Sequence, residues 1–231
     1  MKVFKYLRVA IESIQAHRLR AILTMLGIMI GIAAVLITVG IGSGSAASIT
    51  ERIESSGTNL LTVSSGSRGA TGSTLTIADA ETLMNQERFP TLAQVAPTYQ
   101  SNATLTYGAT EGSYTVVGTT ETYLAVRSQE LADGEFLTAD QVAENSSVAV
   151  LGATVASDLF GGQDPVGQSV RIDDALFEVI GLLESTGSSG FGSSDTQVFV
   201  PIAVAQSRLF NAARYRGNFT ISSISIQAVS Q

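Results

Sequence analysis

The sequence predicts an α+β fold in which one N-terminal transmembrane helix is followed by a mixed α/β domain outside the membrane. Residues 21–42 form an apolar run that contains neither a charged residue nor proline. The residues before this run are basic, whereas the chain after it is acidic. Residues 43–231 interleave short strand and helix patterns and are numerous enough to bury one sizeable core or two small ones. These observations together predict an anchored extracytoplasmic domain.

Residues 1–20 are predicted to form an amphipathic helix on the cytoplasmic side of the membrane. Phe4, Leu7, Ile11 and Ile14 recur at spacings of three, four and three residues, so they share one helix face. Such a helix suits the inner membrane surface, with its basic side toward the lipid headgroups. A partner helix is the other candidate to cover its apolar face.

Residues 21–42, AILTMLGIMIGIAAVLITVGIG, are predicted to span the membrane. As a helix this run covers roughly 33 Å, which matches a hydrocarbon core about 30 Å thick. A backbone in lipid must satisfy its own polar groups, and the hydroxyls of Thr24 and Thr38 can bond to a carbonyl one turn back. The alternatives are a buried helix of a soluble core and a cleaved signal peptide. The run is longer than either of these usually requires.

Gly27 and Gly31 stand four residues apart inside the predicted membrane helix and are candidate helix-packing residues. Small residues at this spacing let a second helix approach closely, although glycine is also common in membrane helices for other reasons. Gly40, Gly42 and Gly44 follow with a period of two, and we expect them to loosen the helix where it leaves the membrane. No strand precedes them, so they do not form a dinucleotide-binding motif.

The distribution of charge predicts the topology. Residues 1–20 hold five basic residues and one acid, net +4, and residues 21–231 hold eight arginines and nineteen acids, net −11, which sum to the total of −7. Basic residues beside a membrane helix tend to stay in the cytoplasm. We therefore expect the plasma (inner) membrane, with a cytoplasmic N-terminus and a periplasmic or extracellular main domain. An acidic, lysine-free outer domain is a poor candidate for binding nucleic acid, which leaves membrane lipid as the expected partner of the anchor.

The first half of the outer domain combines a helix signal with strand patterns. Thr76 and Asp79 have the spacing of a capping box, which marks the start of a helix. A turn is expected near Glu111 and Gly112, between two long strand candidates. In chain order we predict a helical continuation at 46–56, a strand at 59–64, a flexible loop at 65–73, a helix at 77–86, and strands at 92–109 and 112–126.

The second half has sharper turn signals. Gly161 and Gly162 end a short helix, Asp173 and Asp174 form a turn between two strands, and Pro201 opens a helix. In chain order we predict a strand at 147–151, a helix at 153–160, a turn at 163–167, strands at 168–172 and 176–183, a mobile loop at 184–194, a strand at 196–200, a helix at 201–210 and a strand at 219–229.

The outer domain lacks most catalytic side chains. The chain has no cysteine, and residues 43–231 contain neither histidine nor lysine. A Ser-His-Asp triad, a cysteine nucleophile, a Ser-Lys dyad and a histidine-containing zinc site are therefore excluded there. The P-loop pattern is absent as well. We expect no enzyme activity, no catalytic residue, no cofactor and no metal site, and we expect His17, the only histidine, to lie on the surface.

Three stretches of the chain carry a resemblance to a known family. Residues 13–63 contain the pair Leu19-Arg20 entering the helix, then LTMLGIMIGIAAV, a Gly-rich exit and GTNLL. Residues 147–172 read SVAVLGATVASDLFGGQDPVGQSVRI and are followed by FEVIGLL, and residues 198–210 read VFVPIAVAQSRLF. With the DPVG turn as its most specific feature, the chain resembles the front part of a MacB-type ABC transporter permease, of the wider FtsX-like group.

The resemblance implies a division of the outer domain. A porter-like part is expected at about 45–105 and 195–231, and a small inserted α/β subdomain at about 106–194. Family members of this kind continue into three further membrane helices, before which this chain stops, and no ATPase domain is fused to it. The resemblance therefore implies a separate ABC ATPase subunit, a periplasmic adaptor (membrane fusion) protein and a homodimer in the complete permease.

The function implied by the resemblance is that of the membrane-spanning permease subunit of an ABC-type efflux transporter. Such a subunit couples ATP hydrolysis by a separate subunit to movements of a periplasmic domain. Two alternatives are an FtsX-like regulatory protein, which activates a partner without transport, and a plain membrane-anchored recognition module. The DPVG and FEVIGLL segments favour the MacB type over the division type.

Overall fold

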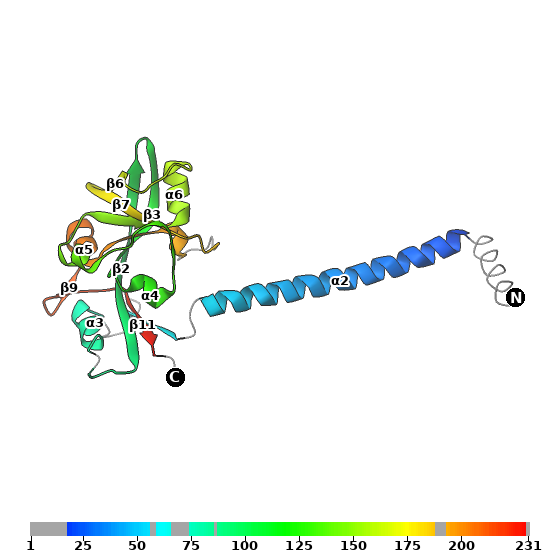
Figure 1. The fold of residues 1–231 in the computed structure, drawn as a ribbon, viewed down its shortest axis with the longest axis horizontal. Helices are drawn as coiled ribbons and strands as arrows, with labels where there is room; N and C mark the ends of the chain where they lie inside the picture. The colour runs from blue at the N-terminus through cyan, green and yellow to red at the C-terminus, as the bar shows by residue number, and fades with distance from the viewer. Residues whose placement is uncertain (1–17, 56–58, 66–73, 86, 188–192, 230–231) are drawn as a thin grey trace. The chain divides into compact units, whose positions relative to one another are not determined.

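The computed structural model describes residues 18–55, 59–65, 74–85, 87–187 and 193–229. It contains two units, Met1–Ser55 and Ser56–Gln231, which we describe separately. The first is a long apolar helix and the second a mixed α/β domain, so the predicted fold class is confirmed (Figure 1). The predicted amphipathic helix with His17, apart from residues 18–20, lies outside the described residues, as do residues 66–73 of the first predicted loop and residues 188–192 of the second.

Helix α2 runs without interruption from Arg18 to Ser55, over 38 residues or about 57 Å. It includes the predicted membrane span and joins it directly to the predicted continuation at 46–56. The expected loosening at Gly40, Gly42 and Gly44 is wrong, because the helix passes through all three glycines. The helix thus continues although each glycine costs about 1 kcal/mol relative to alanine.

The domain begins with a three-stranded antiparallel layer. Strand β11 (Ser223–Ala228) lies between β1 (Leu60–Ser64) and the first part of β2 (Leu92–Tyr107). Helix α3 (Ile77–Leu83) packs its Ala80 against this layer. The predicted capping box is confirmed, since the Thr76 N–H donates to Asp79 Oδ2 at 2.8 Å.

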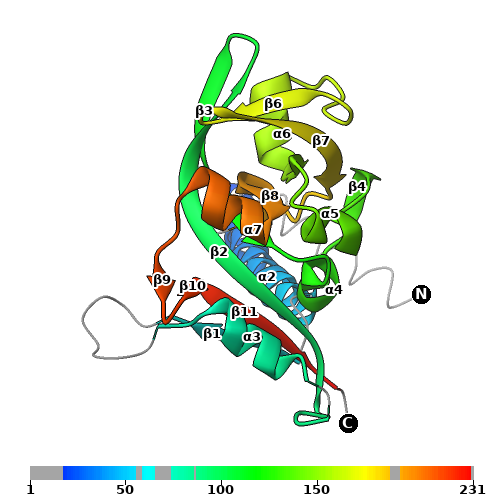
Figure 2. The ribbon, with the colours of Figure 1, turned by 90° about the vertical axis from the view of Figure 1, so that its left-hand side faces the viewer.

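The second part of β2 belongs to a closed ring of six strands. Around the ring, β2 pairs with β3, β3 with β8, β8 with β5, β5 with β7, β7 with β6, and β6 again with β2 (Figure 2). The additional strands of the ring are β3 (Thr110–Thr119), β5 (Val148–Leu151), β6 (Ser169–Ile172), β7 (Ala175–Leu183) and β8 (Gln197–Pro201). Ring closure joins the ends of this sheet, so the six strands enclose a core.

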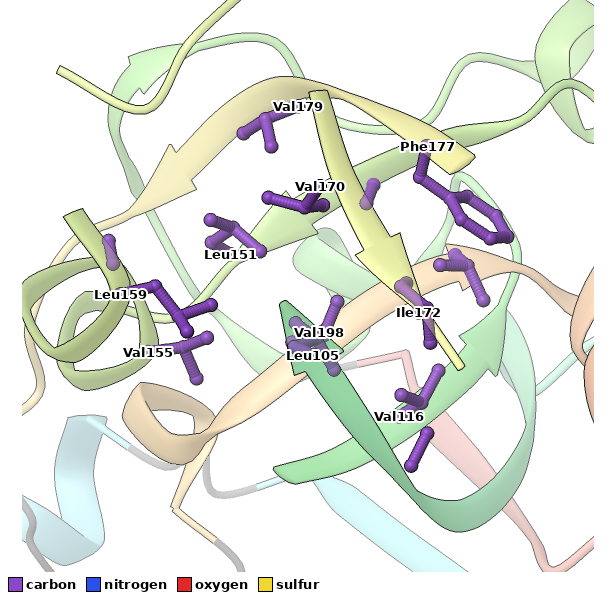
Figure 3. Close-up of a cluster of buried hydrophobic side chains, with 14 of the residues drawn as sticks. Leu105, Val116, Leu151, Val155, Leu159, Val170, Ile172, Phe177, Val179 and Val198 are labelled. Atoms are coloured by element: carbon purple, nitrogen blue, oxygen red, sulfur yellow. The ribbon is translucent and has the colours of Figure 1, made fainter. Parts of the chain in front are cut away.

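The inside of the ring is filled by branched apolar side chains. Paired positions carry them on the same face: Leu105 pairs with Ile172, and Val198 pairs with both Val116 and Leu151. All five are completely buried, and Figure 3 shows them gathered between the strands. Burial of each such side chain stabilises the fold by about 1.5–3 kcal/mol. Helix α6 (Ala153–Phe160) adds its buried side chains to the same cluster.

A second cluster covers the outside of the ring. The ring of Tyr123 in α4 packs at a tilt against Phe199 of β8, with ring centroids 5.1 Å apart, and the ring centroid of Phe136 lies 6.1 Å from that of Phe199. This region contains α4 (Tyr123–Arg127), β4 (Leu131–Gly134) and α5 (Ala139–Ala143). The sequence patterns did not predict β4 or α5, and the strand predicted at 112–126 was wrong at its end, because residues from Tyr123 onward belong to α4.

The remaining elements refine the predicted boundaries. The first long strand ends at Tyr107 and the hairpin turn lies at residues 108–109, not at 111–112. The predicted helix at 77–86 ends at Leu83. A 3₁₀ turn, η1 (Ser194–Thr196), precedes β8. After Pro201 the chain forms α7 (Ile202–Val204) and a π-helical turn, η2 (Ala205–Leu209), and the predicted last strand is split into β10 (Asn218–Phe219) and β11, with β9 (Arg214–Tyr215) before them.

Candidate functional site

The N-terminal helix has the length and composition of a membrane span. Residues Arg18–Ser45 have a mean hydropathy of 2.6 in their most apolar window, and none of that window is buried by the protein. Large side chains such as Leu23 and Leu36 are about two-thirds exposed. A helix with apolar side chains on every face is stable when hydrocarbon surrounds it. This supports membrane anchoring.

The polar side chains within the span are satisfied inside the helix. Thr24 Oγ1 donates to the Arg20 carbonyl at 3.0 Å, and Thr38 Oγ1 donates to the Ala34 carbonyl at 2.8 Å. Both hydroxyls thus bond to the carbonyl one helical turn earlier, and this expectation is confirmed. A hydroxyl paired in this way does not present an unpaired polar group to lipid.

Gly27 and Gly31 lie one turn apart on α2, as predicted, and a Cβ at either position would meet nothing within 4 Å. Their surface is therefore open among the described residues. Packing of a second helix on these two glycines stays a prediction, because the described chain contains no helix seated there.

The described part of the outer domain contains no group of three or more metal-ligating side chains. Its most buried carboxylate, Asp195, is 2% exposed and already has partners. Asp195 Oδ1 accepts from both Thr186 N–H and Thr186 Oγ1 at 3.0 Å, and Oδ2 accepts from Ser185 Oγ at 3.0 Å. These bonds tie the end of β7 to η1, so the carboxylate has a structural role.

Among the residues that the structure describes, the Tyr114 phenol is the titratable group with a clearly shifted pKa. Burial and, secondarily, the Asp158 carboxylate raise the pKa of the Tyr114 phenol above its ordinary value of 10.0. The phenol O–H donates to Asp158 Oδ2 at 3.4 Å and so links β3 to α6. A phenol with a raised pKa stays protonated at neutral pH, and this pair serves to connect two elements.

A shallow apolar groove of about 160 Å³ lies between α3, the start of β2 and the segment before α4. It is lined by Leu83, Met84, Leu92 and neighbouring residues, with Glu121 as the one charged side chain among them. A single exposed carboxylate cannot supply the acid and base pair that hydrolytic chemistry needs.

The chain matches a known protein family over most of its length. The model of the MacB-like periplasmic core domain matches residues 21–231. The chain belongs to this family. The match covers the apolar helix from residue 21 and the whole of the second unit, including the ring of strands and the DPVG turn at 164–167. The family match thus extends over parts of both units, from residue 21 in α2 to the end of the α/β domain.

Relatives of the chain are MacB proteins described as macrolide export ATP-binding/permease proteins. The protein from Hyphomonas neptunium is 37% identical over 228 residues, covering 96% of this chain and 35% of the relative. The protein from Rhodospirillum rubrum is 37% identical over 221 residues, covering 93% of this chain and 33% of the relative. The chain therefore spans about a third of the length of these MacB proteins, and it corresponds to the permease and periplasmic part, not to the ATPase domain.

Solved structures show the same fold. The periplasmic region of MacB from Actinobacillus actinomycetemcomitans matches with a TM-score of 0.64 at 25% identity, covering 79% of this chain and 80% of that one. The extracellular domain of the noncanonic ABC-type transporter YknZ from Gram-positive bacteria matches with a TM-score of 0.58 at 22% identity, covering 74% and 84%. The outer domain is thus a MacB-type periplasmic domain in its fold.

Proposed function

We propose that the chain is the front part of the membrane-spanning permease of an ABC-type efflux transporter, which is driven by ATP hydrolysis in the cytoplasm. The observation that carries this proposal is the match of the MacB-like periplasmic core domain to residues 21–231, together with an apolar helix that leads into that domain. The N-terminus lies in the cytoplasm and the domain lies in the periplasm or outside the cell, in accordance with the positive-inside rule.

The continuity of α2 supports a coupling role. The helix extends ten residues past the candidate membrane span, which ends at Ser45, up to Ser55, and β1 begins five residues later at Leu60. An uninterrupted ladder of i to i−4 hydrogen bonds makes a helix stiff along its axis. A displacement at the cytoplasmic end, caused by closure of an ATPase dimer, would therefore reach the outer domain through this helix. The outer domain would then act on a periplasmic adaptor protein or on substrate.

Disruption of the gene tests the proposed transport. Because the relatives export macrolides by their names, we expect a disrupted strain to become more sensitive to at least one macrolide, and the wild-type gene to restore resistance. Unchanged sensitivity to a macrolide panel, with the wild-type protein present in the membrane, would contradict efflux. That outcome would instead favour the FtsX-like regulatory or anchored recognition module.

The coupling role has a sharper test in the same strain. Ser45→Pro removes a backbone hydrogen bond and clashes with the preceding turn, so it bends or breaks α2 beyond the apolar run. We expect the variant to insert into the membrane but to fail in restoring resistance. Ser45→Ala is the matched control, since alanine keeps the helix, and it should restore resistance fully.

A further inference from the structure

The charges of the outer domain are segregated along the chain. Residues 128–170 contain seven acids and no basic residue, whereas residues 196–231 contain three arginines and no acid. A protein of net negative charge would not need such an acid-free segment for solubility alone. The exposed charged side chains of these two segments are therefore candidates for recognising a partner.

The basic extreme is the hairpin of β9 and β10, residues 214–219, which we call the arginine hairpin. Its two turn residues, Arg216 and Gly217, have positive φ values of 52° and 89°, as a tight two-residue turn requires. Its base is fixed, because the Thr220 N–H donates to the Ala213 carbonyl at 2.9 Å and Gln206 Nε2 donates to the Thr220 carbonyl at 3.1 Å. Gln206 is itself buried, so the hairpin projects from a rigid support.

Aromatic rings orient both guanidinium groups of the hairpin. The Arg214 guanidinium lies 4.1 Å from the centroid of Phe219, and that of Arg216 lies 5.4 Å from the centroid of Tyr215. Both arginines are exposed, and neither has an ion-pair partner among the described residues. A stacked guanidinium keeps its N–H edge available and loses little conformational entropy on binding, which suits the recognition of carboxylates.

The acidic extreme lies at the opposite flank of the same face. We call it the acidic edge: Glu130, Asp133, Glu135, Asp140 and Glu144, all exposed, on and around the edge strand β4 and helix α5. In Figure 1 both β9 and α5 lie at the left margin of the domain. In Figure 2 this margin faces the viewer, with β9 on the left and α5 and β4 on the right.

The arginine hairpin and the acidic edge lie at opposite flanks of one face, so this face is complementary in charge to the same face of a second copy. A half-turn about a vertical axis in front of the face shown in Figure 2 brings the left flank of one copy opposite the right flank of another. Each arginine hairpin then meets the acidic edge of the other copy, so a two-fold contact would contain two identical sets of charge pairs. Complementary charges of this kind set register and partner choice.

We propose that the arginine hairpin docks on the acidic edge of a second copy of this chain. The proposal deepens, and rests on, the homodimer expected for the complete permease. An anionic membrane surface is disfavoured as the occupant, because two arginines contribute only about 1 kcal/mol each near such a surface, and the acidic remainder of the domain is repelled from it.

A charge-swap experiment on the full chain tests the proposal. One pool carries Arg214→Glu with Arg216→Glu, and the other carries Glu130→Arg, Glu135→Arg, Asp140→Arg and Glu144→Arg. With Asp133 kept, the second set changes the charge of the acidic edge from −5 to +3. In each pool alone, both extremes have the same sign and repel, whereas a mixed pair of the two variants restores attraction at both contacts. Because the chain has no cysteine, a Ser113→Cys change in every pool gives one exposed site for fluorescent labels.

Energy transfer between donor-labelled and acceptor-labelled copies in detergent micelles is the measurement. We expect the wild type to associate, each variant alone to associate at least about tenfold more weakly, and the mixture to regain affinity close to that of the wild type. Recovery in the mixture also shows that both variants fold. The wild-type association should weaken as salt rises, since these exposed charges are screened.

The control pool carries Arg88→Glu with Arg171→Glu, which lowers the net charge by the same amount as the hairpin variant but at exposed positions outside the hairpin. It should associate like the wild type. Equal energy transfer in every pool would show association through α2 and would overturn the proposal, as would folded variants that fail to recover on mixing. Neither outcome bears on efflux, which is judged by macrolide sensitivity.

Discussion

Thr104 and Asp173, which are 69 positions apart in the sequence, exchange two hydrogen bonds. The Thr104 N–H donates to Asp173 Oδ1 at 2.9 Å, and the Asp173 N–H donates to the Thr104 carbonyl at 2.8 Å. Thr104 belongs to β2, and Asp173 forms the turn between β6 and β7 in a left-handed conformation with φ of 49°. This pair fastens the last contact that closes the ring of six strands.

Replacement of Asp173 should therefore destabilise the domain. Asp173→Ala removes the carboxylate acceptor and places alanine in a conformation that it adopts reluctantly, so we expect a loss of about 2–3 kcal/mol in unfolding free energy. Denaturant unfolding followed by circular dichroism measures the loss. Asp174→Ala, one position along the same turn, is the control and should cost under about 0.5 kcal/mol. Equal effects of the two variants would contradict this role of Asp173.

Gly152 should tolerate no side chain. A Cβ at this position would lie 2.2 Å from the Ser194 carbonyl oxygen and 2.5 Å from that of Asp195. These are backbone atoms of η1 and cannot rotate away, so we expect Gly152→Ala to cost more than about 2 kcal/mol. Gly187→Ala meets no atom within 4 Å and should cost only the roughly 1 kcal/mol of its positive φ. Thermal unfolding of both variants and of the wild type measures the two losses of stability.

The Tyr114 phenol should titrate at a lower pH when Asp158 is neutralised. Asp158→Asn removes the repulsion that the carboxylate exerts on the phenolate, while burial, the larger cause, continues to raise the pKa above 10.0. The pKa of the native phenol is above that of the unfolded chain, so its contribution to stability is present below about pH 10 and is lost as the pH rises further. Subtraction of the tyrosinate absorbance of Tyr114→Phe from that of the wild type gives the titration curve of the Tyr114 phenol alone. The control Asp133→Asn should leave the pKa of this phenol unchanged.

The topology predicts labelling of the outer domain from outside the inner membrane. A single cysteine at the exposed Ser113, on β3, should react with an impermeant thiol reagent in intact cells after any outer membrane is permeabilised. A cysteine at Lys2 serves as the cytoplasmic control and should react only after the inner membrane is broken. The reverse pattern would show that the domain lies in the cytoplasm.

Gly27 and Gly31 on α2 are predicted to pack against a second helix, which can be tested by substitution. Gly31→Leu fills the open surface beside Gly27 while the segment stays apolar, so insertion should persist and self-association of residues 1–45 should weaken by about 1 kcal/mol. Ile30→Leu is the matched control and should not alter association. A membrane two-hybrid assay that finds equal signals for wild type and Gly31→Leu would show that this surface does not pack.

Local signals in the sequence were sufficient for several elements. The helix Ala153–Phe160 has the predicted bounds, since Gly161 adopts the left-handed conformation that ends a helix. The capping box at Thr76 and the bonds of Thr24 and Thr38 also depend on neighbours within four residues. Short elements without a clear period, such as α4, β4 and α5, gave no such signal. The division into porter-like and inserted parts stays a prediction, although β2 does pair with β11 in its first part and with β3 in its second.

The sequence by itself determined the long apolar N-terminal helix, the absence of histidine, lysine and cysteine chemistry from residues 43–231, and the family, because each depends on residue type and local order. The tertiary structure alone decided that six strands close into a ring and that the arginine hairpin and the acidic edge share one face. The pairing of Leu105 with Ile172 joins segments far apart in the chain, and no local pattern specifies which distant strand completes a sheet. The physical reason is that ring closure depends on the shared packing of one core, to which all six strands contribute.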